Sequence, residues 1–154
     1  MIDITSISAM VAALGVLVGV VFTVLELRNL VQTRQIDLMI RLYSQVMSKD
    51  WLEAWGKVQE REILSHSEYL KKYGFVEVSE VIMFFEQLGL LLQKRLIDID
   101  LLPIPPGQIK VTWEKVKPIA EGGRKRFNEP RLLQGFEYLA NEMQKREQQI
   151  AKIQ

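Results

Sequence analysis

An uninterrupted apolar stretch, Ile4 to Leu25, dominates the hydrophobic pattern of the chain and is bounded by Asp3 and Glu26. A helix of about 20 predominantly apolar residues crosses the hydrocarbon core of a bilayer, and this stretch carries no charged side chain. Apolar residues on every face are typical of a membrane span, because the surface helix of a small soluble domain keeps a polar face. The pattern therefore predicts a transmembrane anchor over residues 1–26.

The charges on either side of this stretch predict its orientation. A cleaved secretory signal begins with basic residues, whereas here Asp3 precedes the stretch and no Lys or Arg does. Arg28, Arg34 and Arg41 follow it, and Lys and Arg are in excess on the cytoplasmic side of membrane proteins. We expect a single-pass protein of the cell membrane, with its N-terminus outside and its C-terminal domain in the cytoplasm.

Small side chains recur at spacings of three and four along the expected span and so share one helical face. Gly15 and Gly19 form a GxxxG pair among them. Small residues let two helix backbones approach closely, which predicts contact with another copy of the chain or with another membrane protein. Gly and Ala are also simply common in membrane helices, so both interpretations stay open. This small-residue stripe consists of Ser8, Ala12, Gly15, Gly19 and Thr23.

Beyond Glu26 the pattern becomes amphipathic. One apolar stripe continues between polar positions, and no Gly or Pro interrupts the chain between Gly19 and Gly56. The span is therefore expected to continue without a break into a cytoplasmic stalk that ends at about Lys49. The stripe consists of Leu27, Val31, Leu38, Leu42 and Val46.

The rest of the chain predicts helices over 51–64, 76–97, 108–121 and 130–143, with a short helical turn around Tyr69–Tyr73. We therefore expect an all-α fold: one N-terminal transmembrane helix continuing into a cytoplasmic stalk, packed with about four further helices as a small bundle. The expected boundaries are a cytoplasmic helical domain over 27–143 and a polar C-terminal helical tail over 144–154.

Particular residues suggest where these helices end and which way they face. Pro118 is expected to bend or shorten its helix, and Gly122-Gly123 to terminate it. Asn128-Glu129-Pro130 is expected to begin the last helix. Glu86, near the centre of 76–97, argues against a second span and is expected to face water or a partner. We expect His66 to be exposed or to cap a helix.

Composition excludes several kinds of chemistry. The 154-residue chain has a formal net charge of +1, which gives no reason to expect a nucleic-acid partner. It has no Cys and a single His, which excludes disulfides and Cys-ligated metals and removes most routes to His-based metal sites and catalytic triads. Asp98 and Asp100 are expected to cap a turn of helix rather than bind a metal. No cofactor, metal or small-molecule substrate is expected.

The most basic part of the chain is Arg124, Lys125 and Arg126, preceded by further lysines. Near a membrane, each basic group contributes about 1 kcal/mol of attraction to anionic lipid heads. Basic residues at a helix C-terminus also suit the helix dipole, without any ligand. The basic cluster is thus either a lipid contact or a solvated helix end.

The arrangement of aromatic and polar positions resembles a family of small membrane-anchored helical proteins of bacteria and archaea catalogued as a domain of unknown function. The resemblance covers nearly the whole chain. It implies a single-pass anchor with a cytoplasmic helical bundle, and it supplies no activity or catalytic residue. The positions that carry it are the N-terminal span, Trp51, Phe85-Glu86, Trp113, Pro118, the run from Arg124 to Arg126, Asn128-Glu129-Pro130 and Phe136-Glu137-Tyr138-Leu139-Ala140.

Three hypotheses about function follow. The first is a membrane-anchored interaction or scaffold protein that self-associates or serves as an accessory subunit of a larger membrane complex, without catalytic activity. The second is a membrane-surface sensor that binds anionic lipid through the basic cluster. The third is an enzyme of unknown class, which would need carboxylates brought together by the fold. The carboxylates available for it are Glu86, Asp98, Asp100 and Glu137.

Overall fold

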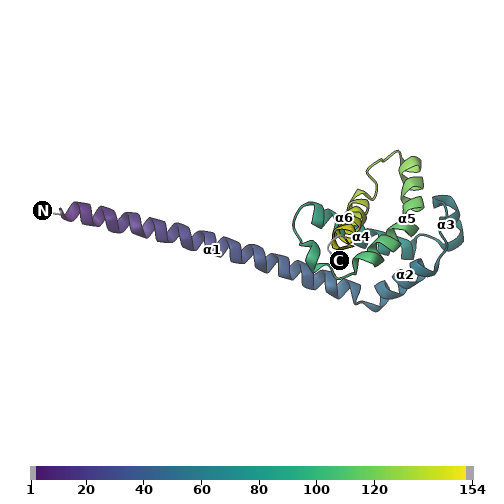
Figure 1. The fold of residues 1–154 in the computed structure, drawn as a ribbon, viewed down its shortest axis with the longest axis horizontal. Helices are drawn as coiled ribbons and strands as arrows, with labels where there is room; N and C mark the ends of the chain where they lie inside the picture. The colour runs from purple at the N-terminus through teal and green to yellow at the C-terminus, as the bar shows by residue number, and fades with distance from the viewer. Residues whose placement is uncertain (1–2, 152–154) are drawn as a thin grey trace. The chain divides into compact units, whose positions relative to one another are not determined.

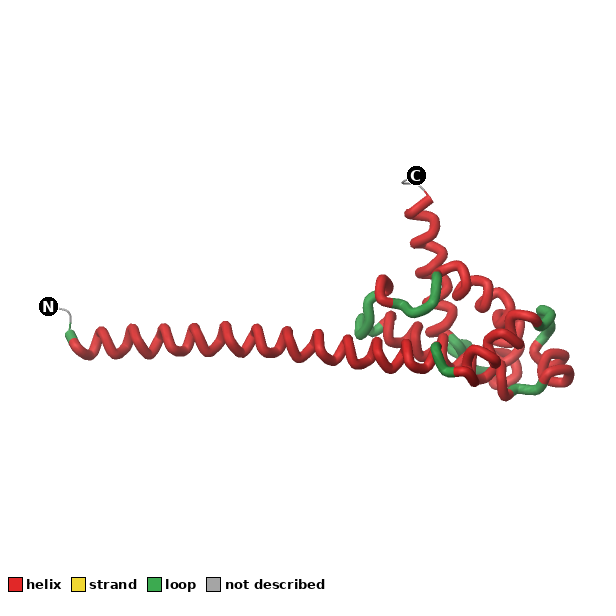
Figure 2. Tube along the Cα trace, turned by 90° about the horizontal axis from the view of Figure 1, so that it is seen from below, coloured by secondary structure: helices red, strands yellow, loops and turns green. Residues whose placement is uncertain are grey.

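The computed structural model describes residues 3–151, which fold as helices joined by turns and loops, without a strand (Figures 1 and 2). The expected all-α fold is confirmed. The short turn around Tyr69 forms a separate helix, and a single 3-10 turn, η1, precedes α5. The elements in chain order are α1 (Ile4–Val46), α2 (Lys49–Glu60), α3 (His66–Tyr73), α4 (Val76–Gln93), η1 (Ile99–Leu101), α5 (Pro106–Phe127) and α6 (Gln134–Ala151).

The chain divides into two compact units, the first running to Leu38 and the second beginning at Met39. The first unit is the N-terminal part of α1, and its large apolar side chains are exposed from Ile4 to Ile36. Within the described residues, one helix is long and apolar enough to cross a membrane. In its Ile7–Val46 stretch, the most apolar 18-residue window has a mean hydropathy of 2.5, and none of that window is buried by the rest of the chain. Residues 27–38 lie in the same unit as the apolar stretch.

The second unit is a helical bundle built around α4. This helix packs against α6 and α2, and α5 packs against α6 and α3. The last turns of α1 belong to this unit and bury Met39, Leu42 and Val46. Burying apolar side chains supplies the main free energy of folding. The most deeply buried large side chains are Val78, Val81, Phe84, Phe85, Leu88, Ile109, Val116, Phe136, Leu139 and Met143.

Aromatic rings connect four helices through this core. Phe85 of α4 stacks on Phe136 of α6, with ring centres 4.6 Å apart and 11° between the planes, and Trp113 of α5 meets Phe136 edge-on at 5.0 Å. Such pairs contribute about 0.5–1.5 kcal/mol each beyond their buried area. The complete run of ring contacts is Trp55, Trp51, Phe84, Phe85, Phe136 and Trp113.

The helices α4 and α6 approach each other closely where two glycines meet. A Cβ atom at Gly89 would overlap the carbonyl group of Gly135, and one at Gly135 would lie 2.6 Å from the carbonyl oxygen of Glu86. At the same crossing, Glu86 Oε2 accepts a hydrogen bond of 2.8 Å from the backbone N–H of Phe136. Glu86 thus satisfies one of the unpaired N–H groups at the start of α6, where negative charge is favourable. The expectation that it faces water or a partner is wrong.

The expected ends of α5 and α6 are also wrong. Pro118, Gly122 and Gly123 all lie inside α5, which continues to Phe127. The glycines are packing positions rather than terminators, because a Cβ at Gly122 would overlap His66 and one at Gly123 would lie 2.8 Å from Leu132 Cδ2.

Asn128 ends α5 instead of beginning the next helix. Its φ of 51° and ψ of 39° are left-handed, a conformation that Asn tolerates better than most residues. Turns follow, and α6 begins only at Gln134. This helix then runs to Ala151, so residues 144–151 of the expected polar tail are helical, and 152–154 lie outside the described residues.

His66 is the first residue of α3 and is buried, contrary to the expectation of an exposed or capping side chain. The capping role belongs to Ser65, which forms a reciprocal capping box with Glu68. The hydrogen bonds from the hydroxyl of Ser65 and then from its backbone N–H lower the pKa of Glu68, because they favour its charged form. The His66 side chain packs against α5 at the two glycines and lies edge-on to the ring of Phe127.

We expect Gly89→Ala to destabilise the bundle by about 1–3 kcal/mol, because the added methyl group meets backbone atoms that cannot rotate away. Calorimetric unfolding of the full chain measures this. Gly56→Ala is the matched control, since a Cβ at Gly56 meets no atom within 4 Å. It should be neutral or raise stability by about 0.5–1 kcal/mol through better helix propensity. Equal stability of the two variants would show that α4 and α6 do not cross at Gly89.

Candidate functional site

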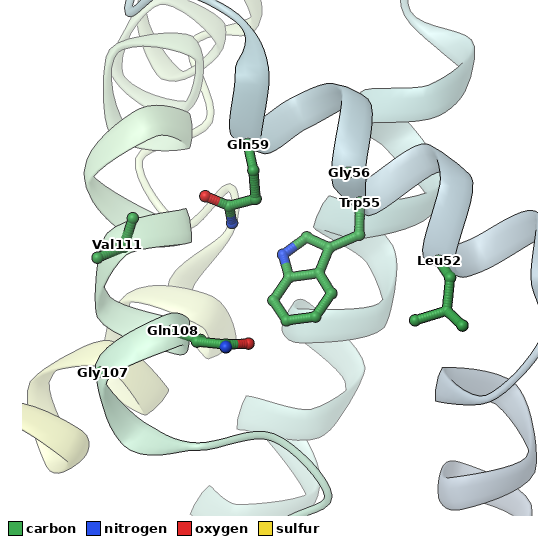
Figure 3. Close-up of a pocket in the computed structure, with 7 residues that line it drawn as sticks. All are labelled: Leu52, Trp55, Gly56, Gln59, Gly107, Gln108 and Val111. Atoms are coloured by element: carbon green, nitrogen blue, oxygen red, sulfur yellow. The ribbon is translucent and has the colours of Figure 1, made fainter.

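A cavity of about 400 Å³ lies in the second unit, between α2 and the first turns of α5 (Figure 3). This volume falls in the range of small-molecule sites in proteins. The indole of Trp55 forms one wall, and the carboxamides of Gln59 and Gln108 converge on the space beside it. No charged side chain lines the cavity. Its lining consists of Leu52, Trp55, Gly56, Gln59, Gly107, Gln108 and Val111.

Thr112 positions two of these side chains from behind. Its fully buried hydroxyl accepts hydrogen bonds from Trp55 Nε1 at 3.1 Å and Gln59 Nε2 at 2.5 Å, and donates one to the carbonyl of Gln108 at 2.7 Å. A hydroxyl has one donor and two acceptor sites, so that of Thr112 is fully used. The hydroxyl therefore holds α2 on α5 and fixes the orientation of the indole.

Sequence reasoning missed this site. Trp55 and Gln59 are four residues apart on α2, as are Gln108 and Thr112 on α5, so each pair shares one helical face. The signal in the sequence that could have predicted this site is that two separate helical segments each carry such a pair. Nothing in either segment alone shows that these faces meet.

The basic cluster is divided by the fold. Arg124 is partly buried: its Nε donates to the carbonyl of Leu132 at 2.9 Å, and its guanidinium pairs with Glu137 at 2.6 Å. It therefore joins the end of α5 to α6. Lys125 and Arg126 are exposed, and Arg126 lies 5.7 Å from the ring centre of Phe127, a side chain that is 64% exposed.

The small-residue stripe lies on exposed α1 within the first unit. Ser8, Ala12, Gly15 and Gly19 are exposed, and a Cβ added at either glycine would meet no atom of the chain within 4 Å. The hydroxyl of Thr23 donates to the carbonyl of Gly19 at 2.8 Å, which satisfies it within its own helix. The stripe is thus open along its length.

The carboxylates considered for catalysis are engaged separately. Asp98 Oδ1 accepts from the N–H of Asp100 at 3.0 Å and caps η1, as expected. Asp100 is paired with Arg146 of α6, while Glu86 caps α6 and Glu137 holds Arg124. Over the described residues, no group of three or more His, Asp or Glu side chains has a metal-binding arrangement.

A second charged cluster joins α2, α3 and α4. The guanidinium of Arg61 donates to the Tyr69 hydroxyl at 3.1 Å, pairs with Glu77 at 3.5 Å and lies 4.8 Å from the ring centre of Tyr73. Burial opposes the charge, but these hydrogen bonds and the ion pair outweigh it and raise the pKa of Arg61. The pKa of Glu77 is lowered by a backbone hydrogen bond and by Lys57. The cluster stabilises the packing of α3.

A comparison with family models matches residues 9–143 to a family described as "Domain of unknown function (DUF4760)". The match includes most of the apolar stretch of α1 together with the bundle up to Met143 of α6. No curated protein and no solved structure was found to match the chain.

We expect Thr112→Val to destabilise the bundle by about 1–3 kcal/mol, because Trp55 and Gln59 lose their acceptor while shape is kept. Calorimetry of the full chain measures the effect. Thr112→Ser is the control: it keeps the hydroxyl and loses only a methyl group, so it should cost clearly less. If the serine variant is the less stable of the two, the hydroxyl is not what holds α2 on α5.

Proposed function

The chain belongs to the DUF4760 family, and we propose that it is a membrane-anchored helical interaction protein without catalytic activity of its own. It self-associates or serves as an accessory subunit of a larger membrane complex. One observation carries the proposal: the Ile7–Val46 stretch of α1 is strongly apolar, and none of its most apolar window is buried by the chain. Apolar surface of this extent marks contact with a membrane or with another protein.

The small-residue stripe supports a protein contact within the membrane. Lipid tails are as apolar as Leu, so helices associate in a bilayer through close packing rather than through the hydrophobic effect. Gly15 and Gly19 leave open space that a second helix backbone fills. The family match begins at residue 9, which places both glycines inside the matched domain.

A second apolar surface supports contact outside the first unit. Ile40 and Tyr43 of α1 and Met47 just after it are spaced three and four apart, and they are 63%, 43% and 66% exposed. The neighbouring face of the same turns buries Met39 and Leu42 in the core. The apolar surface of this segment is therefore wider than the bundle covers, which suits a partner helix.

We propose that the chain has no catalytic activity because the carboxylates that an enzyme would need already have other partners. Each carboxylate considered for catalysis has a structural partner, either a helix N-terminus or an arginine. A general acid or base must instead reach a substrate proton. Their placement favours a structural role.

A second candidate function is supported by the end of α5. Lys125 and Arg126 are exposed beside Phe127, and basic residues next to an exposed aromatic ring are typical of contact with the membrane interface. In this alternative the second unit binds anionic lipid heads. The favourable position of cations at a helix C-terminus accounts for the same residues without a ligand.

The first experiment measures the mass and composition of the particle extracted gently from native membranes. We expect either multiples of this chain or a fixed ratio with another protein. In the first case, Gly15→Leu with Gly19→Leu should reduce the mass to that of a monomer, because bulky side chains separate the helices. Val16→Leu with Val20→Leu is the control on a neighbouring face and should leave the mass unchanged. A native particle that contains one copy of this chain and no other protein contradicts the proposal.

Lipid binding is tested on a chain that begins at Met39, the first residue of the second unit. Binding to vesicles should rise with their anionic lipid content and fall with salt. Lys125→Gln with Arg126→Gln should weaken binding about fivefold for each charge removed, at about 1 kcal/mol per basic group. Lys49→Gln with Lys71→Gln removes the same charge elsewhere and is the control. If the two double substitutions weaken vesicle binding equally, the binding reflects only the net charge of the unit, and the basic cluster has no special role.

A further inference from the structure

The cavity between α2 and α5 contains hydrogen-bonding groups that the protein leaves unused. Gln59 Nε2 is committed to Thr112, but no donor within the described part of the chain bonds to the Gln59 carboxamide oxygen. The Gln108 side chain is exposed, and its carboxamide makes no hydrogen bond to any described residue. Figure 3 shows both carboxamides directed toward the space beside Trp55. The cavity thus offers one fixed acceptor together with a free donor and acceptor.

The charge of the lining restricts what these groups bind. None of the lining residues is ionisable. The carboxylate of Glu147 lies beside Gly107 and is paired with Lys110. A charged ligand would therefore find no partner of opposite charge in the lining to offset the hydration that it loses against Trp55, which is unfavourable. The ligand that fits is uncharged.

The shape of the cavity favours a flat ring. The indole of Trp55 is a rigid planar wall, held in place by its hydrogen bond to Thr112 and by its contact with Trp51 at 4.9 Å. Offset stacking on such a wall is favourable for another aromatic ring. Two glycines of the lining, Gly56 beside Trp55 on α2 and Gly107 across the cavity on α5, carry no side chain, and a Cβ at Gly56 would enter empty space (Figure 3).

We propose that this cavity binds an uncharged planar ring compound whose edge carries a carboxamide or an equivalent donor–acceptor pair. The ring stacks on Trp55, the ligand N–H donates to Gln59, and the ligand carbonyl accepts from Gln108. The proposal is independent of self-association, because every residue that it uses belongs to the second unit of one chain.

Benzamide, benzoate and benzylammonium are suitable probes, because they have nearly the same shape and differ in charge. They are titrated into the full chain in detergent micelles while the indole N–H resonance of Trp55 is followed by NMR. We expect a saturable shift with benzamide, at a Kd on the order of 1 mM for a ligand of this size. Benzoate and benzylammonium should bind at least about tenfold more weakly.

Variants separate binding in the cavity from partition into the micelle. Gly56→Leu places an apolar side chain in the cavity, starting from a Cβ position that meets no atom within 4 Å, and should abolish the saturable shift. Glu53→Leu adds the same side chain to an exposed position of α2 outside the cavity lining and should leave it unchanged. Gln108→Leu changes an exposed side chain that makes no hydrogen bond within the described residues, and it should weaken binding about fivefold by removing a hydrogen bond to the ligand.

The proposal is overturned if benzamide gives no saturable shift up to concentrations on the order of 10 mM, tenfold above the expected Kd. It is also overturned if a charged probe binds as well as benzamide, or if both Gly56→Leu and Gln108→Leu bind like the unmodified chain. Self-association is measured by particle mass, so failure of one proposal does not affect the other.

Discussion

The bundle depends on the crossing of α4 and α6, where two glycine backbones lie in contact and Glu86 caps the start of α6. The close approach brings Phe85 against Phe136, and Phe136 in turn meets Trp113 of α5. Neither helix could shift along the other without placing a side chain on backbone or exposing the Glu86 hydrogen bond. The positions of α5 and α2 follow from this crossing, since α5 packs on α6 and α2 on α4.

Much of this fold could be predicted from the sequence, because its signals are local. The apolar stretch up to Leu25 and the unbroken pattern after it predicted one long helix, and α1 runs from Ile4 to Val46. The apolar segment from Val76 predicted the central helix of the bundle, and α4 contributes more of the deeply buried side chains than any other helix of the described residues. Periodicity within a segment is sufficient for such predictions.

Predictions failed where a residue's partner is distant in the chain. Glu86 binds a backbone group 50 residues away, and a central carboxylate without that partner would face water. Gly122 is inside α5 because His66 packs on it, whereas the sequence alone favours a helix end. The cavity site could not be predicted for the same reason, because its residues are distant in the chain. Gln59 and Gln108 carry no motif, and only the packing of α2 on α5 brings them together. Lys125 and Arg126 remain exposed, so their role depends on partners outside the chain.

The ring contacts that connect the four helices have an optical consequence. The chain has three tryptophans, Trp51, Trp55 and Trp113, and all of them belong to this single aromatic run in the second unit. Intrinsic indole fluorescence therefore reports on the bundle and is insensitive to the first unit, whereas far-ultraviolet circular dichroism also includes the long α1 helix. Denaturation curves from the two signals would coincide only if both units lose their structure together, so their separation measures how independently the units unfold.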